Sequence, residues 1–263
     1  MNFLTKRYSF ITCFSMYIII FGTILLTGIC SAEDLILHLS FDEINGDVVS
    51  DLSGYNNDAE FNGNHKLVDG MFGKAIELDG ASWGEVEDHD SLHVVDGITV
   101  EFWANLRPSA GGAGSDVQTG VEKGNSWKAG LFTLAAWYRG GSLLQFFDLP
   151  DNCREHNIGD NIQDETWHFL AGTWDGTTIK LYIDGELNKE LECKGKLTSN
   201  NEPLFIGARG GNQRFVNGAL DEIKIYDYAL TQEELMLDMD NPSANVTPTD
   251  DKLTTTWARI KSR

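Results

Sequence analysis

The sequence has few basic residues for its size. Of its 263 residues, 20 are Lys or Arg and 40 are Asp or Glu, which gives a formal net charge of −20. Because a strongly negative field repels polyanions, we expect no nucleic acid partner and no acidic membrane partner. The acidic side chains can instead hold a divalent cation, or they can serve only to keep the protein soluble.

The sequence also lacks the motifs of the common catalytic classes. It contains no Gly-x-Ser-x-Gly, no His-Glu-x-x-His, no phosphate-binding loop and no Glu-x-Asp-x-x-Glu pair of the glycosidase type. Its 6 histidines are scattered along the chain. We therefore expect a protein without enzymatic activity.

Cysteine is scarce, and the spacing of the cysteines is not that of a zinc site. Two of the 4 cysteines fall in the first thirty residues, which leaves Cys153 and Cys193. In an exported chain this pair favours a disulfide that closes a loop of about forty residues. The alternative is two separate buried thiols.

The N-terminus has the order of a secretion signal. Lys6 and Arg7 precede an apolar run over residues 11–29, and Cys30-Ser31-Ala32 follows. We expect residues 1–32 to be a signal cleaved after Ala32, with no stable membrane insertion afterwards. The protein is then secreted or on the cell surface, or periplasmic in a Gram-negative host. Because the apolar run is long, an uncleaved membrane tether is the alternative.

Short apolar segments separated by turn residues predict a single all-β domain over residues 33–240. Residues 98–106 alternate between two faces, and Asp175-Gly176 and Asp184-Gly185 predict hairpins. A capping box at residues 231–234 predicts one short helix near the end of the domain. Residues 107–130 read as a long loop, and residues 241–263 as a linker with a short basic tail.

An ordered series of segments carries a family resemblance. The segments read LHLSFDE, GKAIELDG, ITVEFWANL, TWHFLAGTWDG and GALDEIKIYDYALTQEEL. Together they resemble the laminin G-like jelly-roll family of concanavalin A-like domains. The resemblance implies a two-sheet antiparallel jelly-roll sandwich, commonly a bound calcium ion, and a role in binding glycans or proteins.

In that fold the first and last strands lie side by side, which suggests a structural calcium site. Asp42 follows the first strand, and Asp221 stands where we expect the closing strand to begin. These carboxylates can share one ion, with Asn57 or Asp58 and backbone carbonyls adding oxygens. Alternatively, Asp42 and Asn57 cap turns, and Asp221 pairs with a Lys or Arg.

Aromatic side chains outside the strand periodicity are the candidates for stacking on a sugar ring. Arginine and amide side chains in one loop can bond sugar hydroxyls. We assign the tryptophans of the resembling segments, Trp103, Trp167 and Trp174, to the framework. These patterns predict recognition of a glycan or glycoprotein, or alternatively a protein-interaction or structural surface module without a sugar site. The predicted ligand-binding residues are Trp83, Trp127, Trp137, Tyr138, Arg209, Asn212 and Arg214.

Overall fold

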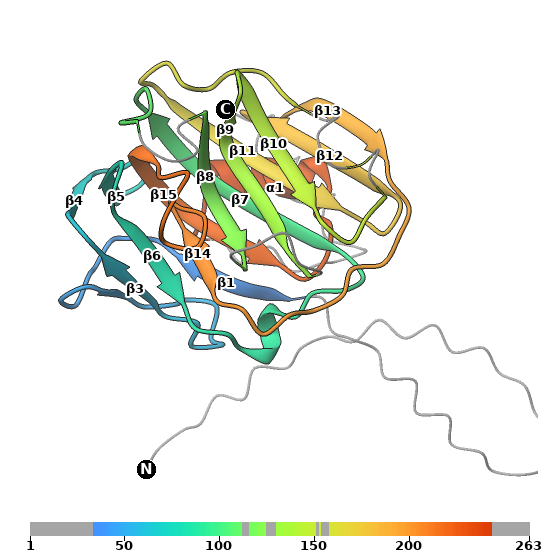
Figure 1. The fold of residues 1–263 in the computed structure, drawn as a ribbon, viewed down its shortest axis with the longest axis horizontal. Helices are drawn as coiled ribbons and strands as arrows, with labels where there is room; N and C mark the ends of the chain where they lie inside the picture. The colour runs from blue at the N-terminus through green and yellow to red at the C-terminus, as the bar shows by residue number, and fades with distance from the viewer. Residues whose placement is uncertain (1–33, 112–115, 125–129, 151–152, 154–157, 244–263) are drawn as a thin grey trace, which may run out of the picture.

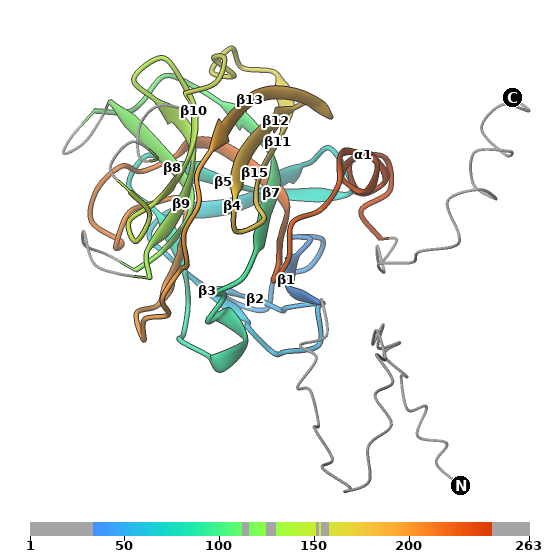
Figure 2. The same ribbon diagram turned by 90° about the vertical axis from the view of Figure 1, so that its right-hand side faces the viewer.

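The computed structural model describes residues 34–111, 116–124, 130–150, 153 and 158–243. The predicted signal and the tail from residue 244 lie outside these ranges. Two antiparallel sheets pack face to face, with one short helix on the outside of the first (Figures 1 and 2). This is the predicted all-β jelly-roll sandwich.

The first sheet has eight strands and the second has seven. The path of the first sheet is β13 (Glu186–Glu192), β12 (Thr178–Ile183), β11 (Trp167–Trp174), β7 (Ile98–Leu106), β15 (Asn217–Tyr226), β5 (Lys74–Asp79) and β4 (His65–Asp69), and β1 (Leu35–Leu39) also pairs with β15. The second sheet runs β10 (Gly141–Phe146), β9 (Phe132–Tyr138), β8 (Val117–Lys123), β14 (Leu204–Ile206), β6 (Trp83–Val86), β3 (Ala59–Asn62) and β2 (Val48–Val49).

The closing strand β15 changes partners at its middle. Residues 217–220 pair with β5 and residues 223–226 pair with β1, while β7 lies along the other side. The change falls at Asp221 and Glu222, where the register with β7 shifts and Glu222 has φ 49°. The first and last strands are therefore neighbours, as the resemblance implied.

The main core fills the space between the sheets. Phe102, Trp174 and Ile225 from the first sheet share one buried cluster with Phe61 and Phe146 from the second. Only glycine fits at position 120 on β8, because the ring of Phe102 occupies the space that a Cβ would need. Close packing of this kind fixes the distance between the two sheets.

The helix α1 (Gln232–Asp240) covers the outer face of the first sheet (Figure 2). Thr231 is its N-cap, and the reciprocal bonds with Glu234 form the predicted capping box. Leu235 and Met239 belong to a second apolar cluster that also contains Trp103 and Phe169. In that cluster Trp103 and Phe169 lie with ring centroids 5.5 Å apart.

The structure corrects three details of the predicted elements. The expected loop at residues 107–130 contains β8, whose polar side chains hid its strand character although both of its faces are covered. β4 was not expected. The closing strand begins at Asn217, so Asp221 lies inside it rather than at its start.

The predicted disulfide between Cys153 and Cys193 is present, with the two Cα atoms 5.8 Å apart. Cys193 follows β13 of the first sheet, and Cys153 lies in the connection from β10 to β11. The bond therefore links that connection to an edge of the first sheet.

Candidate binding groove on the second sheet

One row of side chains crosses the outer face of the second sheet. Because alternate residues of a strand face opposite sides, the neighbours of core residues such as Val86 and Val121 point outward. Exposure falls along the row from Glu60, which is exposed, through Glu85, which is half-buried, to four buried residues. Cross-strand register gives the row as Glu60, Glu85, Phe205, Glu122, Thr133 and Gln145.

The buried half of this row is closed by Arg209. Its Nε donates to Glu122 Oε1 at 2.6 Å, and its guanidinium lies 5.7 Å from the centre of the Phe147 ring. Burial raises the pKa of Glu122, and the charge of Arg209 opposes that rise. Both side chains of this ion pair are buried, with 2% of Arg209 and 0% of Glu122 exposed.

The other half of the row is open and forms a groove of about 490 Å³ over β3 and β6. Its lining is rich in carboxylate and amide side chains, which can accept hydrogen bonds from hydroxyl or amino groups. The acidic lining disfavours anionic ligands. The polar lining residues are Asn56, Asn57, Asp58, Glu60, Asn62, Glu85, Glu87, Asp88 and His89. Of these nine residues, only Asn57 and Asp58 were predicted as site residues, and they were predicted as metal ligands. The alternation in residues 59–62 and 83–86 indicates that Asn62 and Glu85 face outward.

Trp83 lies next to the groove without being one of its lining residues, on the same strand face as Glu85 and directly opposite the lining residue Asn62. Its ring is half-buried and lies 6.1 Å from the ring of Phe215. Gly211 approaches it so closely that a Cβ there would lie 2.7 Å from Trp83 Nε1. The loop at residues 207–216 thus holds the indole beside the groove.

The structure gathers part of the predicted ligand-binding set around this loop. Trp83, Arg209 and the exposed Asn212 lie at or in it. Arg214 lies near Glu122 and Arg209. Burial is the main cause that lowers the pKa of Arg214; the charge of Arg209 lowers it further, and that of Glu122 raises it.

The remaining predicted aromatics are placed differently. Tyr138 is buried below the guanidinium of Arg139, which lies 5.2 Å from its ring centre. Trp137 packs against the main core. Trp127 lies outside the described residues. Of the framework tryptophans, Trp174 is in the main core, whereas Trp103 and Trp167 pack on the outside of the first sheet.

The predicted metal ligands Asp42 and Asp221 each accept an amide hydrogen from the segment that joins β4 to β5. Asp221 Oδ2 accepts the amide hydrogen of Phe72 at 3.0 Å, and Asp42 Oδ1 accepts that of Lys74 at 3.0 Å. Asp221 Oδ1 is buried and has no hydrogen-bond partner among the described residues. Burial raises the pKa of Asp221 to about 7, against the opposing effect of the Phe72 amide. A buried carboxylate oxygen without a partner fits a cation ligand.

Asn57 and Asp58 hold other contacts. Asn57 Nδ2 donates to the carbonyl of Ile36 at 2.7 Å, and Asp58 Oδ1 accepts the amide hydrogen of Asp51 at 2.9 Å. Both residues line the groove. In the part of the chain that the structure describes, no three His, Cys, Asp or Glu side chains are grouped as a metal site.

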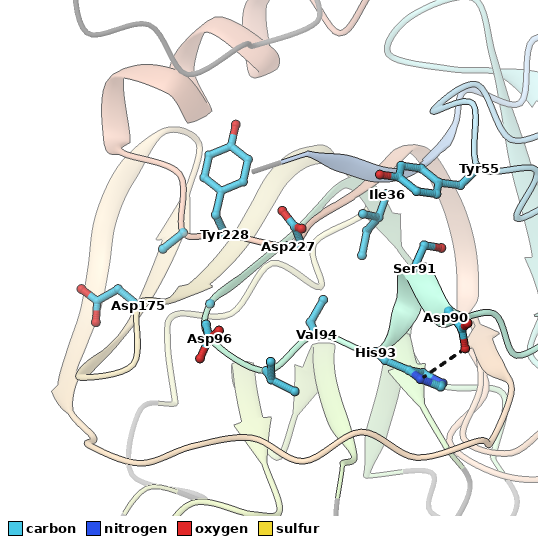
Figure 3. Close-up of a pocket in the computed structure, with 13 residues that line it drawn as sticks. Ile36, Tyr55, Asp90, Ser91, His93, Val94, Asp96, Asp175, Asp227 and Tyr228 are labelled. Carbon is cyan, nitrogen blue, oxygen red and sulfur yellow. Dashed lines mark ion pairs between the residues drawn. The ribbon is translucent and has the colours of Figure 1, made fainter. Parts of the chain in front are cut away.

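A second cavity, of about 500 Å³, lies near the start of β7. Asp96 and Asp175 lie on one side of it, and Asp90 and His93 on the other (Figure 3). The carboxylate of Asp175 already accepts the amide hydrogens of residues 177 and 178. No tryptophan is among the described residues that line either cavity, but Trp83 lies next to the groove, opposite its lining residue Asn62.

Comparison with known proteins gives a family and a fold. The family model described as the concanavalin A-like lectin/glucanases superfamily, of the laminin G type, matches residues 78–236. Human pappalysin-1 is 23% identical over 184 residues, which cover 63% of this chain and 11% of pappalysin-1. The chain thus spans about a tenth of the length of that relative.

Two solved structures illustrate the likeness in fold. Domain 4 of AbnA, an extracellular arabinanase from Geobacillus stearothermophilus, in complex with arabinotriose, has a TM-score of 0.60 at 22% identity, over 78% of this chain and 97% of the domain. The binding domain of botulinum neurotoxin DC in complex with SialylT has a TM-score of 0.56 at 15% identity, over 79% of this chain and 51% of that chain. Among the described residues of this protein, no helix has the length and apolarity needed to span a bilayer.

Proposed function

The chain belongs to the concanavalin A-like lectin/glucanases superfamily, and from that premise we propose that it is a secreted, non-catalytic module that binds a carbohydrate or the glycan of a glycoprotein. The observation that carries this proposal is the groove over β3 and β6, with Trp83 next to it, opposite the lining residue Asn62. A half-buried indole offers an apolar face to a sugar ring, while Asn62, Glu60 and Glu85 accept bonds from hydroxyls.

The charge of the groove narrows the ligand class. Carboxylates outnumber the single histidine in its lining, so sialic acids, uronic acids and sulfated sugars are repelled. Neutral glycans and amino sugars fit this lining. Arabinotriose, which the domain of AbnA holds, is a neutral sugar of this kind.

The test is a glycan array that contains neutral, amino and acidic glycans, followed by calorimetry on the best ligand. Trp83→Ala should weaken binding by about 5- to 150-fold, because one ring stacked on a flat partner contributes about 1–3 kcal/mol. Trp167→Ala is the matched control, since Trp167 is also half-buried but lies on the first sheet. An array without a hit, together with a protein partner captured by this chain, would favour the interaction-module alternative.

The proposal includes a structural calcium ion held by Asp42 and Asp221. Two carboxylates at one turn, one of them buried with an unpartnered oxygen, support it. Calcium would supply the positive charge that this buried acid lacks. Chelation should then lower the melting temperature, and added calcium should restore it. Asp221→Asn should abolish this calcium dependence, and an unchanged melting temperature in excess chelator would exclude the site.

A further inference from the structure

A lysine and a carboxylate are buried together beneath α1. Lys224 on β15 is 1% exposed and Asp238 on α1 is 2% exposed. Lys224 Nζ lies 2.8 Å from Asp238 Oδ1. Removing two such charges from water is costly, and a neutral bond between the groups would relieve that cost. Neither residue lines the groove or belongs to the turn between β4 and β5 that contacts Asp42 and Asp221.

A second carboxyl group lies beside the pair. Glu101 on β7 is directly opposite Lys224 in the register of β7 with β15, and it is 1% exposed. Its Oε2 has no hydrogen-bond partner among the described residues. Burial, followed by the nearby charge of Asp238, holds the pKa of Glu101 well above its usual range. Glu101 is therefore equipped to carry a proton in a site that water does not reach.

The carboxyl of Asp238 is also polarised from its other side. The Tyr226 hydroxyl donates to Asp238 Oδ2 at 2.5 Å. Burial and the neighbouring carboxylates raise the pKa of Tyr226, so the hydroxyl keeps its proton. A fixed donor at this oxygen would stabilise negative charge that develops there during attack on the carboxyl carbon.

We propose that Lys224 and Asp238 condense to form an intramolecular isopeptide bond that joins β15 to α1. The neutral Lys224 amine attacks Cγ of Asp238, a C–N bond forms and one C–O bond breaks. Lys224 begins as an ammonium group and loses two protons in the reaction. Glu101 passes both protons to the departing Asp238 oxygen, which leaves as water, and Glu101 ends unchanged. The balance is one ammonium plus one carboxylate giving one amide plus one water, with no oxidant or reductant.

The position of the pair favours this reaction. Reacting groups held in contact behave as though each were present at about 10⁵–10⁸ M, and exclusion of water disfavours hydrolysis of the amide. Arginine is the usual choice for a buried ion pair, whereas lysine becomes a nucleophile when it loses its proton. The bond would fix α1, the cover of the first sheet, covalently to the closing strand.

Tryptic digestion of the full folded chain and mass spectrometry test the proposal. We expect no cleavage after Lys224, and a single peptide of residues 215–252 that is lighter by one water molecule. Fragmentation should place the link between Lys224 and Asp238. Cleavage after Lys224 that releases residues 215–224 and 225–252 at full mass, after prolonged incubation of the folded chain, would overturn the proposal.

Two variants separate the isopeptide from other losses of water. Lys224→Arg keeps a buried cation but cannot form the amide, so its peptides should have full mass; a loss of water that persists would indicate a succinimide at Asp238 and overturn the proposal. Glu101→Gln should slow bond formation by about 10²–10⁴-fold, the usual contribution of a proton carrier. Circular dichroism of each variant confirms folding, and bond formation at the normal rate in Glu101→Gln would remove Glu101 from the reaction.

Discussion

Charged side chains are buried on the outer face of the first sheet but exposed to solvent in the groove on the outer face of the second. On the first sheet, α1 excludes water, and Lys224 and Asp238 are buried against each other, with the Tyr226 hydroxyl on the second Asp238 oxygen. On the second sheet, Glu60 and Glu85 lie at the open groove and face solvent. Burial rather than residue type therefore decides whether a carboxylate is structural or available to a ligand.

The largest expected effect comes from breaking the closed face. Lys224→Met leaves Asp238 and Glu101 buried without a cation, and the free energy of unfolding should fall by about 3–5 kcal/mol. Urea denaturation measures this loss. In the control, Lys194→Ala, the broken ion pair with Glu192 is exposed and no change should be measurable. Equal effects of the two substitutions would contradict the comparison.

The disulfide allows stability to be separated from binding. Replacing both Cys153 and Cys193 by Ser removes the constraint on a 40-residue separation and should cost about 2–4 kcal/mol of unfolding free energy. Because neither cysteine lines the groove, glycan affinity at low temperature should stay the same. A loss of affinity in a variant that remains folded would mean that the groove depends on this distant link.

Asp221 is a buried carboxylate that has no cationic partner among the described residues, and the pH dependence of stability should reveal its effect. Folding raises the pKa of Asp221 from its ordinary 3.8 to about 7, so the folded state holds this proton more tightly. The contribution is fully present below about pH 4 and is lost as pH rises through 7, by up to about 4 kcal/mol. Without calcium, Asp221→Asn should therefore flatten stability between pH 4 and 7, as followed by thermal melting. If the free energy of unfolding changed by the same amount between pH 4 and 7 in the wild type and in Asp221→Asn, this role of Asp221 would be contradicted.

The smallest expected effect is at the start of α1. Thr231→Ala removes the N-cap of the helix that closes the first sheet and should cost about 1 kcal/mol. Glu85→Gln on the open face should change stability by less than about 0.5 kcal/mol, as is usual for solvent-facing positions. Urea denaturation of both variants compares the faces, and a larger loss from Glu85→Gln would reverse the assignment.

Local chemistry made much of the fold predictable. The Thr231–Glu234 capping box is readable because both partners lie within one helical turn. Asp184-Gly185 adopts positive φ at both residues, as expected for a hairpin turn, whereas Asp175 does not and instead accepts amide hydrogens from residues 177 and 178. β8 escaped prediction because its polar residues are buried by distant chain segments.

The candidate groove was only partly predictable for the same reason. Trp83 stands out because it is an aromatic residue between glycine-rich segments. In the sequence Arg209 looks like a ligand-binding arginine, and only the tertiary structure shows that it is paired with Glu122, 87 residues away. Nothing in the sequence around Glu60 indicates that Glu85 faces it.

The sequence by itself determined the alternation of the strands, the turns, the helix cap and the surplus of negative charge, because each depends on neighbouring residues or on composition. Only the tertiary structure decided which carboxylates are buried and which are exposed to solvent. It placed Asp238 against Lys224 and left Glu85 beside the groove, since water is excluded only when sheets and helix pack together.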